Sequence, residues 1–592
     1  MKRVIVSLLM VFVLALSLSI TQAKPAQVTL ANAFFAEQIP AGAGIYMAIR
    51  TDDAYIDELD GILSKITTYL TSIDVPVPPD FGMRQLLDMA FMSSSPPMDF
   101  TNDTRPWLGS SAAWAVYFNE SGFIDNLMVI IDHSNRELAE AMIENLNQAE
   151  VTVSVEGDFK VYSYDSGLSA ITINDDAIYI TGGENSTPFT GVTGDVLSND
   201  LNFQRAVGAL PAPSYNILFV VETATLVTLA DNNRQSTGDF IRAVAPDAYT
   251  AIGATIVNGI SPTLDIAQVG LPTEIVSLIN TPIDPVFAQN IPANATGVIH
   301  GTNLIAPYNA LIDLVSVQTG QDLRAQLDQA QAIFGVDVIN LLLSGDFAMY
   351  FTYKTDMFEA VINEQIESLD VNPYGAPPDF FKLLEFGYIF EISNPADAQA
   401  LVDQVANLYA MLGASTAGMT LSREEIGGGN ALVISTQVTS ESTLDLVIGA
   451  NDRVMVMGTR ESATAILNGD GGFDSNTFYQ NSLRYTLPTM THYWFLDRNS
   501  VVAIGLLALT GPIIGGVFEN IFDEFNNTPT LTPEEIERRN EIIREQTRQT
   551  LLATLDFQAQ LNQFAQLLDN ASVSVSSKEG ILFVRAVITL SE

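Results

Sequence analysis

Four side chains with oxygen ligands alternate along a glycine-rich stretch in the second half of the chain. They are Asn468, Asp470, Asp474 and Asn476. Carboxylate and amide oxygens are ligands that Ca²⁺ accepts, so this stretch is a candidate calcium site. It departs from an EF-hand loop, because Gly472 has no ligand side chain and Phe473 stands where that loop needs glycine. The alternative interpretation is a loop without metal.

Other residue types that could perform chemistry are scarce. Histidine occurs only as His133, His300 and His492, cysteine is absent, and no H-E-x-x-H, G-x-S-x-G, S-x-x-K or phosphate-loop lysine motif is present. The triple glycine at 427–429 precedes a strand-like run, whereas a phosphate cradle precedes a helix, so a hairpin turn is favoured. The sequence therefore predicts no catalytic residue, and no cofactor besides the possible calcium.

The charge of the chain is strongly acidic. Aspartate and glutamate number 69 against 26 lysines and arginines, for a net charge of -43. Such a surface repels nucleic-acid phosphates and anionic lipid headgroups, which excludes nucleic acid as a partner. With 592 residues, of which 47% are hydrophobic, we expect sizeable cores in more than one domain.

The N-terminus has the pattern of an export signal. Lys2 and Arg3 precede an uncharged, mostly apolar run over 4–20, and small residues then lead to Ala23. We therefore predict a signal peptide over 1–23, cleaved after Ala23 or, at a second A-x-A pattern, after Ala33. The run is short for a membrane span, so a retained anchor is the alternative. We expect an extracytoplasmic bacterial protein in the periplasm, at the cell surface or secreted, with no further membrane span.

One stretch of the sequence occurs twice. Residues 35–43 read FAEQIPAGA, and residues 287–295 read FAQNIPANA. Later matches follow in the same order, and we align 114–118 with 347–351 and 175–182 with 451–458. We interpret this order as an internal duplication, with a first repeat over 34–271, a linker over 272–285 and a second repeat over 286–592.

Strands and helices alternate irregularly, and hairpin turns are frequent. This pattern predicts α+β units with largely antiparallel sheets and packed helices. The second repeat contains a helical insert near 499–567, which begins with an uncharged run over 501–518. Thr532, Pro533 and Glu535 then form the capping signature of a long helix. Its polar first half, 533–549, is predicted to project for a partner or a second protomer.

The order of these motifs resembles a bacterial family of exported proteins catalogued as domain of unknown function 3352. The resemblance covers nearly all of the mature chain. It rests on the F-A-x-x-I-P-A start, a strand that leads into a Ser–Asn helix cap, and a closing strand after a Gly–Ile turn. Because that family has no established activity, the resemblance implies a shared fold and no active site.

These observations favour a non-catalytic binding or scaffold protein whose partner is an unknown protein or an apolar ligand. The alternative is an envelope hydrolase with a carboxylate-based or calcium-assisted site. A cluster of acids in a deep pocket would indicate the hydrolase. A broad groove between the copies, apolar and poor in polar groups, would indicate binding.

Overall fold

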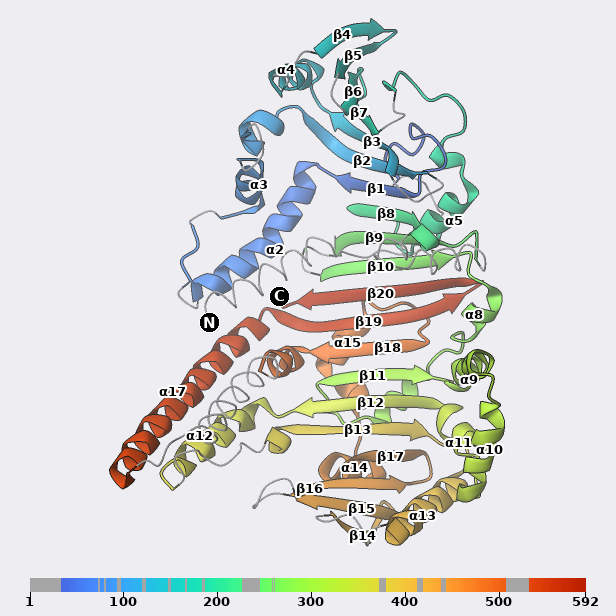
Figure 1. Ribbon diagram of the computed structural model, residues 1–592, viewed down its shortest axis with the longest axis vertical. Coiled ribbons are helices and arrows are strands. Elements are labelled where there is room, and N and C mark those ends of the chain that lie inside the picture. The colour runs from blue at the N-terminus through green and yellow to red at the C-terminus, as the bar shows by residue number, and fades with distance from the viewer. Residues whose placement is uncertain are drawn as a thin grey trace. The chain divides into compact units, whose positions relative to one another are not determined.

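The computed structural model describes residues 33–591 apart from 73–74, 79–80, 93–96, 120–123, 147–150, 165–167, 184–186, 226–244, 258, 260, 372–379, 413–418, 438–442 and 507–531 (Figure 1). The predicted signal peptide over 1–23 lies outside the described residues. The chain forms two compact units: Met1–Ser277 with Val575–Leu590, and Leu278–Ser574. The last strand, which the sequence assigned to the second repeat, is therefore part of the first unit.

The first unit is built on an antiparallel sheet with the strand order β4–β5–β6–β7–β3–β2–β1–β8–β9–β10–β20. The bounds of its strands are β1 Ile45–Arg50, β2 Leu108–Phe118, β3 Ile124–His133, β4 Val151–Glu156, β5 Phe159–Tyr164, β6 Leu168–Ile173, β7 Ala177–Gly183, β8 Ile217–Glu222, β9 Tyr249–Val257, β10 Ser261–Val269 and β20 Ile581–Leu590. Long runs of β-branched and aromatic residues favour these strands.

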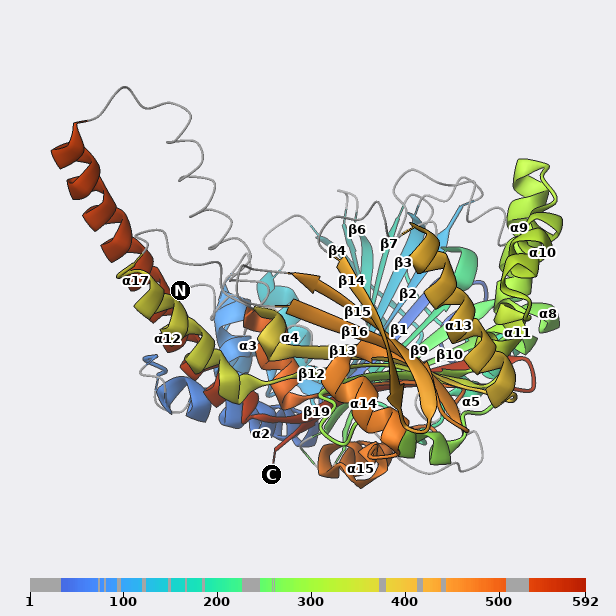
Figure 2. The ribbon, with the colours of Figure 1, turned by 90° about the horizontal axis from the view of Figure 1, so that it is seen from below.

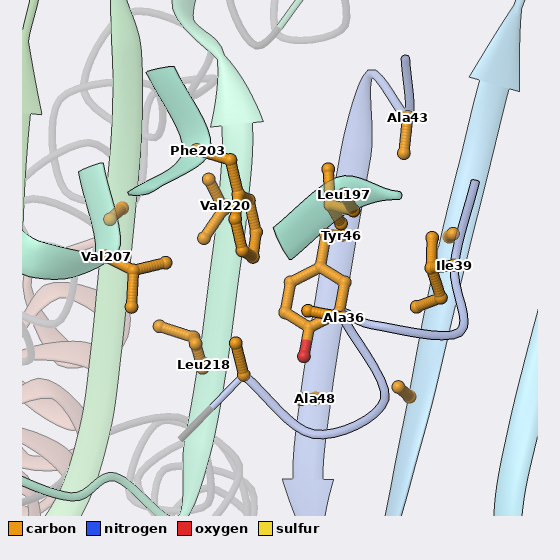
Figure 3. Close-up of a cluster of buried hydrophobic side chains, with 14 of the residues drawn as sticks. Ala36, Ile39, Ala43, Tyr46, Ala48, Leu197, Phe203, Val207, Leu218 and Val220 are labelled. Carbon is orange, nitrogen blue, oxygen red and sulfur yellow. The ribbon is translucent and has the colours of Figure 1, made fainter. Parts of the chain in front are cut away.

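Helix α5 covers the core face of this sheet. The helices of the first unit are α2 Asp53–Ser72, α3 Met83–Met92, η2 Phe100–Thr104, α4 Arg136–Leu146, η3 Leu197–Asn199, α5 Leu201–Ala209 and α8 Thr273–Ser277. Asp200 begins α5, because its carboxylate accepts hydrogen bonds from two backbone N–H groups of the first turn. Phe203 of α5 meets Tyr46 edge-on, with ring centroids 5.2 Å apart, and Ile39 of the repeated motif lies in the same cluster (Figure 3).

The second unit is built on an antiparallel sheet with the strand order β14–β15–β16–β17–β13–β12–β11–β18. The bounds of its strands are β11 Gly297–Thr302, β12 Asp346–Tyr353, β13 Leu384–Glu391, β14 Met419–Ile426, β15 Gly429–Gln437, β16 Thr443–Ala450, β17 Val454–Thr459 and β18 His492–Asp497. β19, Leu568–Lys578, divides between the units at Ser574. Gly427 and Gly428 form the turn between β14 and β15 with positive φ, as the hairpin prediction requires.

The helices that the structure describes in the second unit are η4 Pro285–Asn290, α9 Ile305–Thr319, α10 Leu323–Phe334, α11 Val338–Leu343, η5 Thr355–Met357, α12 Phe358–Ser368, η6 Phe380–Leu383, α13 Pro395–Leu412, α14 Arg460–Asn468, η7 Phe473–Ser475, α15 Thr477–Leu483, a helix over 498–506, and α17 Pro533–Ala565. Some of them cover the two faces of the sheet over part of its width. Figure 2 shows α13 on one side of the strands and α14 and α15 on the other. The mixture of helices with a large antiparallel sheet confirms the predicted α+β class.

The strand registers correct two details of the sequence alignment. The repeated motif aligns Met47 with Ile299. In the sheets, Met47 pairs with Trp114, and Ile299 pairs with Met349. Trp114 therefore corresponds to Met349, two residues from the expected Phe347. Trp114 and Phe347 do lie on strands in equivalent places of the two orders, β2 and β12.

The second correction concerns a turn. The side-chain oxygen of Asn174 accepts the backbone N–H groups of Asp176 and Ala177, and that of Asn451 accepts those of Arg453 and Val454. Asn174 therefore corresponds to Asn451, one residue from the expected Asp175. The sequence alignment placed Asp175 and Asp176 on Asn451 and Asp452, whereas the turn in each unit is made by an asparagine side chain.

The predicted linker and insert both contain ordered structure. Within 272–285, α8 belongs to the first unit, while Ile283 is buried in the core of the second. The insert starts as a helix over 498–506, which includes the first part of the uncharged run, and residues 507–531 lie outside the described residues. Helix α17 begins at Pro533 with the predicted capping box between Thr532 and Glu535. Among the described residues, no helix is both long and apolar enough to cross a membrane.

Candidate apolar binding faces

The second sheet has an apolar face opposite its core. Cross-strand pairing brings one residue from each of five neighbouring strands into a row. The row consists of Trp494, Ile299, Met349, Tyr388 and Met457. The side chains of Trp494, Met457 and Tyr388 are 50%, 41% and 40% exposed. Such large side chains, exposed together, mark a surface suited to binding.

Two further rows flank this central row. They consist of Leu496, Gly297, Phe351 and Phe386 on one side, and of His492, Gly301, Phe347 and Phe390 on the other. Burial, and then the nearby His300, lower the pKa of His492 below its ordinary value, so its ring is neutral at neutral pH. The three rows, called here the second apolar face, therefore carry no charge.

Two glycines on β11 let aromatic rings lie across the strand. A Cβ atom at Gly297 would stand 2.2 Å from the Phe351 ring, and one at Gly301 would stand 2.7 Å from the Phe347 ring. Any larger residue would displace these rings. The glycines therefore leave room for these aromatic rings in the two flanking rows of the second apolar face.

Helix α13 limits this face on the side of β15 and β16. Its residues Leu401 and Val402 are buried in one cluster with Leu432, Ala450 and Met455 of the strands below. Met455 lies opposite Phe390 in the ladder between β13 and β17. Helix α13 thus covers one end of the same sheet face. The three rows between β18 and β17 lie next to this covered end.

The first unit has a corresponding face. Its central row runs across β20, β10, β9, β8, β1, β2 and β3. The row consists of Val584, Ile266, Ile252, Phe219, Met47, Trp114 and Val129. All of these side chains are apolar and half-buried. The row continues to Ile180 and Ile171, where α4 contributes Ala139 and Ile143 to a buried cluster.

The calcium candidates serve other purposes where the structure shows their contacts. The side chain of Asn476 caps α15 by accepting the Tyr479 N–H, and it donates to the carbonyl of Ala293 at 3.0 Å. Asn468 ends α14, and the backbone N–H of Asp470 donates to the Ala465 carbonyl. Within the described part of the chain, no three histidine or acidic side chains are grouped to hold a metal. The calcium site stays a prediction.

His133 lies in the first unit, whereas His300 and His492 lie on the paired strands β11 and β18 of the second. His133 contacts the carbonyl oxygen of Asn174 at 2.9 Å through Nε2. His300 is buried on the core side, where its Nε2 lies 2.8 Å from Asp346 and its ring stacks on Phe287. These contacts explain His133 and His300 as parts of the packing. His492, which lies on the second apolar face, is the one that borders a candidate site.

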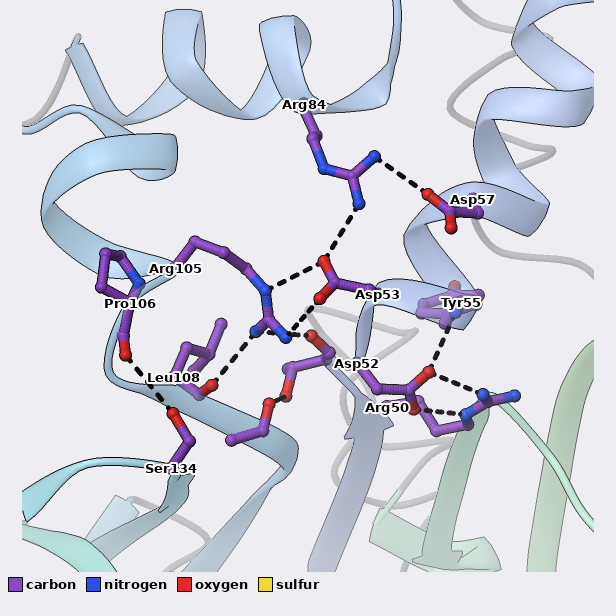
Figure 4. A network of polar contacts seen from close by, with 12 residues as sticks. Arg50, Asp52, Asp53, Tyr55, Asp57, Arg84, Arg105, Pro106, Leu108 and Ser134 are labelled. Atoms are coloured by element: carbon purple, nitrogen blue, oxygen red, sulfur yellow. Dashed lines mark hydrogen bonds and ion pairs between the residues drawn. The ribbon is translucent and has the colours of Figure 1, made fainter.

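An ionic network of the first unit joins α2, α3 and the segment after η2. Asp53 at the start of α2 accepts hydrogen bonds from Arg84 of α3 and from Arg105 after η2 (Figure 4). Arg84 also donates to Asp57, while Arg50 donates to Asp52. The two guanidinium groups lower the pKa of Asp53, as expected for a carboxylate in stable ion pairs.

A recess of about 340 Å³ lies between η2 and α4. Trp107, Met98 and Met142 supply its apolar lining, and Asn102, Asp103 and Asn145 are among its polar residues. The Pro- and Asp-rich loop that follows α3 supplies one side of this recess, and α4 supplies the other. One carboxylate among amide and thioether groups does not form the acid pair that glycoside hydrolysis requires.

Sequence reasoning missed the apolar faces, because each row is made of residues from separate strands. The sequence did contain one pattern that indicates such faces. Runs such as 114–118 and 347–351 are apolar at nearly every position, whereas a strand with one solvated face alternates with polar residues. Continuous apolar strands therefore indicate a sheet with two apolar faces.

Comparison with protein-family models, with characterised proteins and with solved structures returns no match for this chain. The resemblance to the exported family therefore stays a prediction.

Proposed function

We propose that this protein is an exported, non-catalytic binding protein whose ligand is apolar and lies on the apolar sheet faces. The row of Trp494, Ile299, Met349, Tyr388 and Met457 carries the proposal, since three of its five large side chains are at least 40% exposed. Exposed apolar surface is unfavourable in water, at about 25 cal/mol per Å², and a ligand that covers it recovers this energy.

The test uses the uncharged dye Nile red and two methionine variants. Met457 lies in the central row, and Met419 on β14 is 44% exposed outside the three rows. Met457→Lys should weaken dye binding about tenfold, because a charge beside an apolar ligand costs at least ~1.4 kcal/mol. Met419→Lys should bind as the native protein does. Equal binding by both variants would refute the second apolar face as the site.

We further propose that the two units arose by duplication. The strands β14, β15, β16, β17, β13, β12, β11 and β18 follow in the order of β4, β5, β6, β7, β3, β2, β1 and β8. The repeated motif also makes the same contact in each unit: Leu197 N–H donates to the Ile39 carbonyl at 2.8 Å, and Phe473 N–H donates to the Ile291 carbonyl at 3.1 Å.

Export is supported by the sequence of the first 23 residues, and we propose cleavage after Ala23. Ala33 is buried in the core of the first unit, and its carbonyl accepts the Ala36 N–H. Cleavage after Ala33 would remove this residue from the core, so N-terminal sequencing of exported protein should find Lys24. A first residue of Phe34 would contradict the proposed site, and recovery of Met1 in membranes would indicate an anchor.

The first half of α17 is proposed as a contact surface for a second protomer or another protein. Ile536 and Ile542 are 46% and 53% exposed on it. Further along, Arg544 donates to the carbonyl of Leu369 after α12, and Arg548 pairs with Asp370. Ile536 and Ile542 lie in the part of 533–549 that precedes Arg544.

A further inference from the structure

We propose that the second apolar face binds the acyl chain of a lipid with an uncharged or zwitterionic headgroup. This inference rests on the proposed function, since it names the ligand of that site. The central row from Trp494 to Met457 crosses five strands and spans roughly 19 Å, because neighbouring strands lie about 4.8 Å apart. An extended palmitoyl chain can follow a row of this length.

The hydrogen-bonding capacity of the face favours an acyl chain over a polypeptide. Among the residues of the three rows, only Trp494, Tyr388 and His492 have polar side-chain atoms. The strands beneath use their backbone groups on both sides: β11 pairs with β12 and β18, and β13 pairs with β12 and β17. An extended peptide would leave N–H and C=O groups unpaired here, each at a cost of about 1–3 kcal/mol. An acyl chain has no such groups.

The surroundings of the face make a flat protein surface a poor partner. Helix α13 packs on the same side of the sheet over β15 and β16, through Leu401 and Val402. A helix that stands on a sheet rises about 10 Å above it. A second sheet or a second copy of this face would meet the helix before reaching Met349 in the middle of the row. A narrow chain fits beside the helix.

Charge selects the headgroup. The face itself is uncharged, and the whole chain carries a net charge of -43. An anionic headgroup at the edge of the face would be repelled by this field, whereas a zwitterionic or uncharged one would not. The exposed rings of Trp494 and Tyr388 also attract a quaternary ammonium group, because their π faces are negative.

The experiment uses tryptophan fluorescence, because the chain has 3 tryptophans and Trp494 lies in the central row. In the full chain with Trp107→Phe and Trp114→Phe, Trp494 is the sole indole. Palmitoyl lysophosphatidylcholine with bromine on its chain, kept below its micelle concentration, should quench Trp494 in a saturable manner. Met457→Lys should weaken this binding about tenfold, and Met419→Lys should leave it unchanged. If the double variant fails to fold, quenching lost on Trp494→Phe in the native chain gives the same information.

The outcomes separate the ligand class from the site. Absence of quenching, with Nile red binding still sensitive to Met457→Lys, would overturn the acyl chain and leave the proposed function standing. Loss of both signals would overturn both. Equally strong quenching by brominated palmitate would overturn the headgroup selection. Displacement of the lipid by an uncharged leucine- and alanine-rich peptide, at equal concentration, would show that the face is a peptide site.

Discussion

Arg585 on the last strand is paired with Asp265 on β10 in the interior of the first unit. Its Nε and Nη2 atoms lie 2.6 and 2.9 Å from the two carboxylate oxygens of Asp265. The side chains are 5% and 0% exposed. The hydroxyl of Tyr215 donates to the same carboxylate at 2.8 Å. Burial raises the pKa of Asp265, and the Arg585 guanidinium opposes that rise. The last strand thereby supplies the counter-charge for a carboxylate that is buried in the first unit.

Arg585→Met should destabilise the first unit by about 3–5 kcal/mol, because it leaves the Asp265 carboxylate buried without its counter-charge. Urea denaturation followed by circular dichroism measures the loss. The double variant Asp265→Leu/Arg585→Met should recover much of it, since no buried charge then remains. A single variant as stable as the native protein would show that water reaches Asp265.

The second unit should lose stability as pH rises through 6, because the buried carboxyl of Asp497 then ionises. Burial raises its pKa from 3.8 to about 6, while the hydrogen bonds from Ser500 act against that rise. The folded state then holds this proton more tightly than the unfolded chain, so its contribution is complete below pH ~4 and is lost as pH rises through ~6. The loss is on the order of 3 kcal/mol.

Asp497→Asn is the matched control, since the amide oxygen can still accept the Ser500 N–H that begins the following helix. Between pH 4 and pH 7, the unfolding free energy of the native protein should fall by more than that of Asp497→Asn, and the difference should be on the order of 3 kcal/mol. Other carboxylates, such as Asp53, have lowered pKa values and change stability in the opposite direction, but they are common to both proteins. An identical pH dependence would show that Asp497 titrates normally.

Asn451→Ala should cost more stability than Asn174→Ala. Each asparagine accepts two backbone N–H groups in its turn, worth about 1–2 kcal/mol together. Asn451 in addition donates to the carbonyl of Leu467 at 3.1 Å, at the end of α14. Substitution by aspartate keeps the acceptor and removes the donor, so it should be milder at position 174 than at 451. Thermal unfolding of the four variants tests this order, and equal costs at both positions would contradict it.

Ile536→Lys and Ile542→Lys should abolish self-association without loss of stability. Both side chains are exposed on the first half of α17, where a partner helix could bury them. Leu552→Lys, at 42% exposure on the same helix, is the control outside the 533–549 segment. Sedimentation velocity gives the oligomeric state. A native protein that is monomeric at all concentrations would remove the homo-oligomer and leave only another protein as partner.

The parts of this protein that the sequence determined are those whose contacts are local. The Thr532–Glu535 capping box joins residues three apart, and the turn at Gly427–Gly428 depends on backbone freedom at those positions. The proposed repeat could be predicted because residues 35–43 and 287–295 share most of their letters, and this motif makes the same contact in each unit. The sequence alignment of the two repeats was displaced by one or two residues from the structural one. Apolar strands such as 114–118 can be aligned with one another in several ways.

Tertiary structure alone decided which residues share a surface. Trp494, Ile299 and Tyr388 come from distant segments, and only the pairing of β18, β11, β12 and β13 brings them into one row. The same holds for Arg585 and Asp265, which stand 320 positions apart. A pleated strand specifies which side chains share its face, but the hydrogen-bonded neighbours of that strand specify which faces join. The apolar character of each strand was therefore present in the sequence, whereas the continuous apolar face depends on how the strands pair in the sheet.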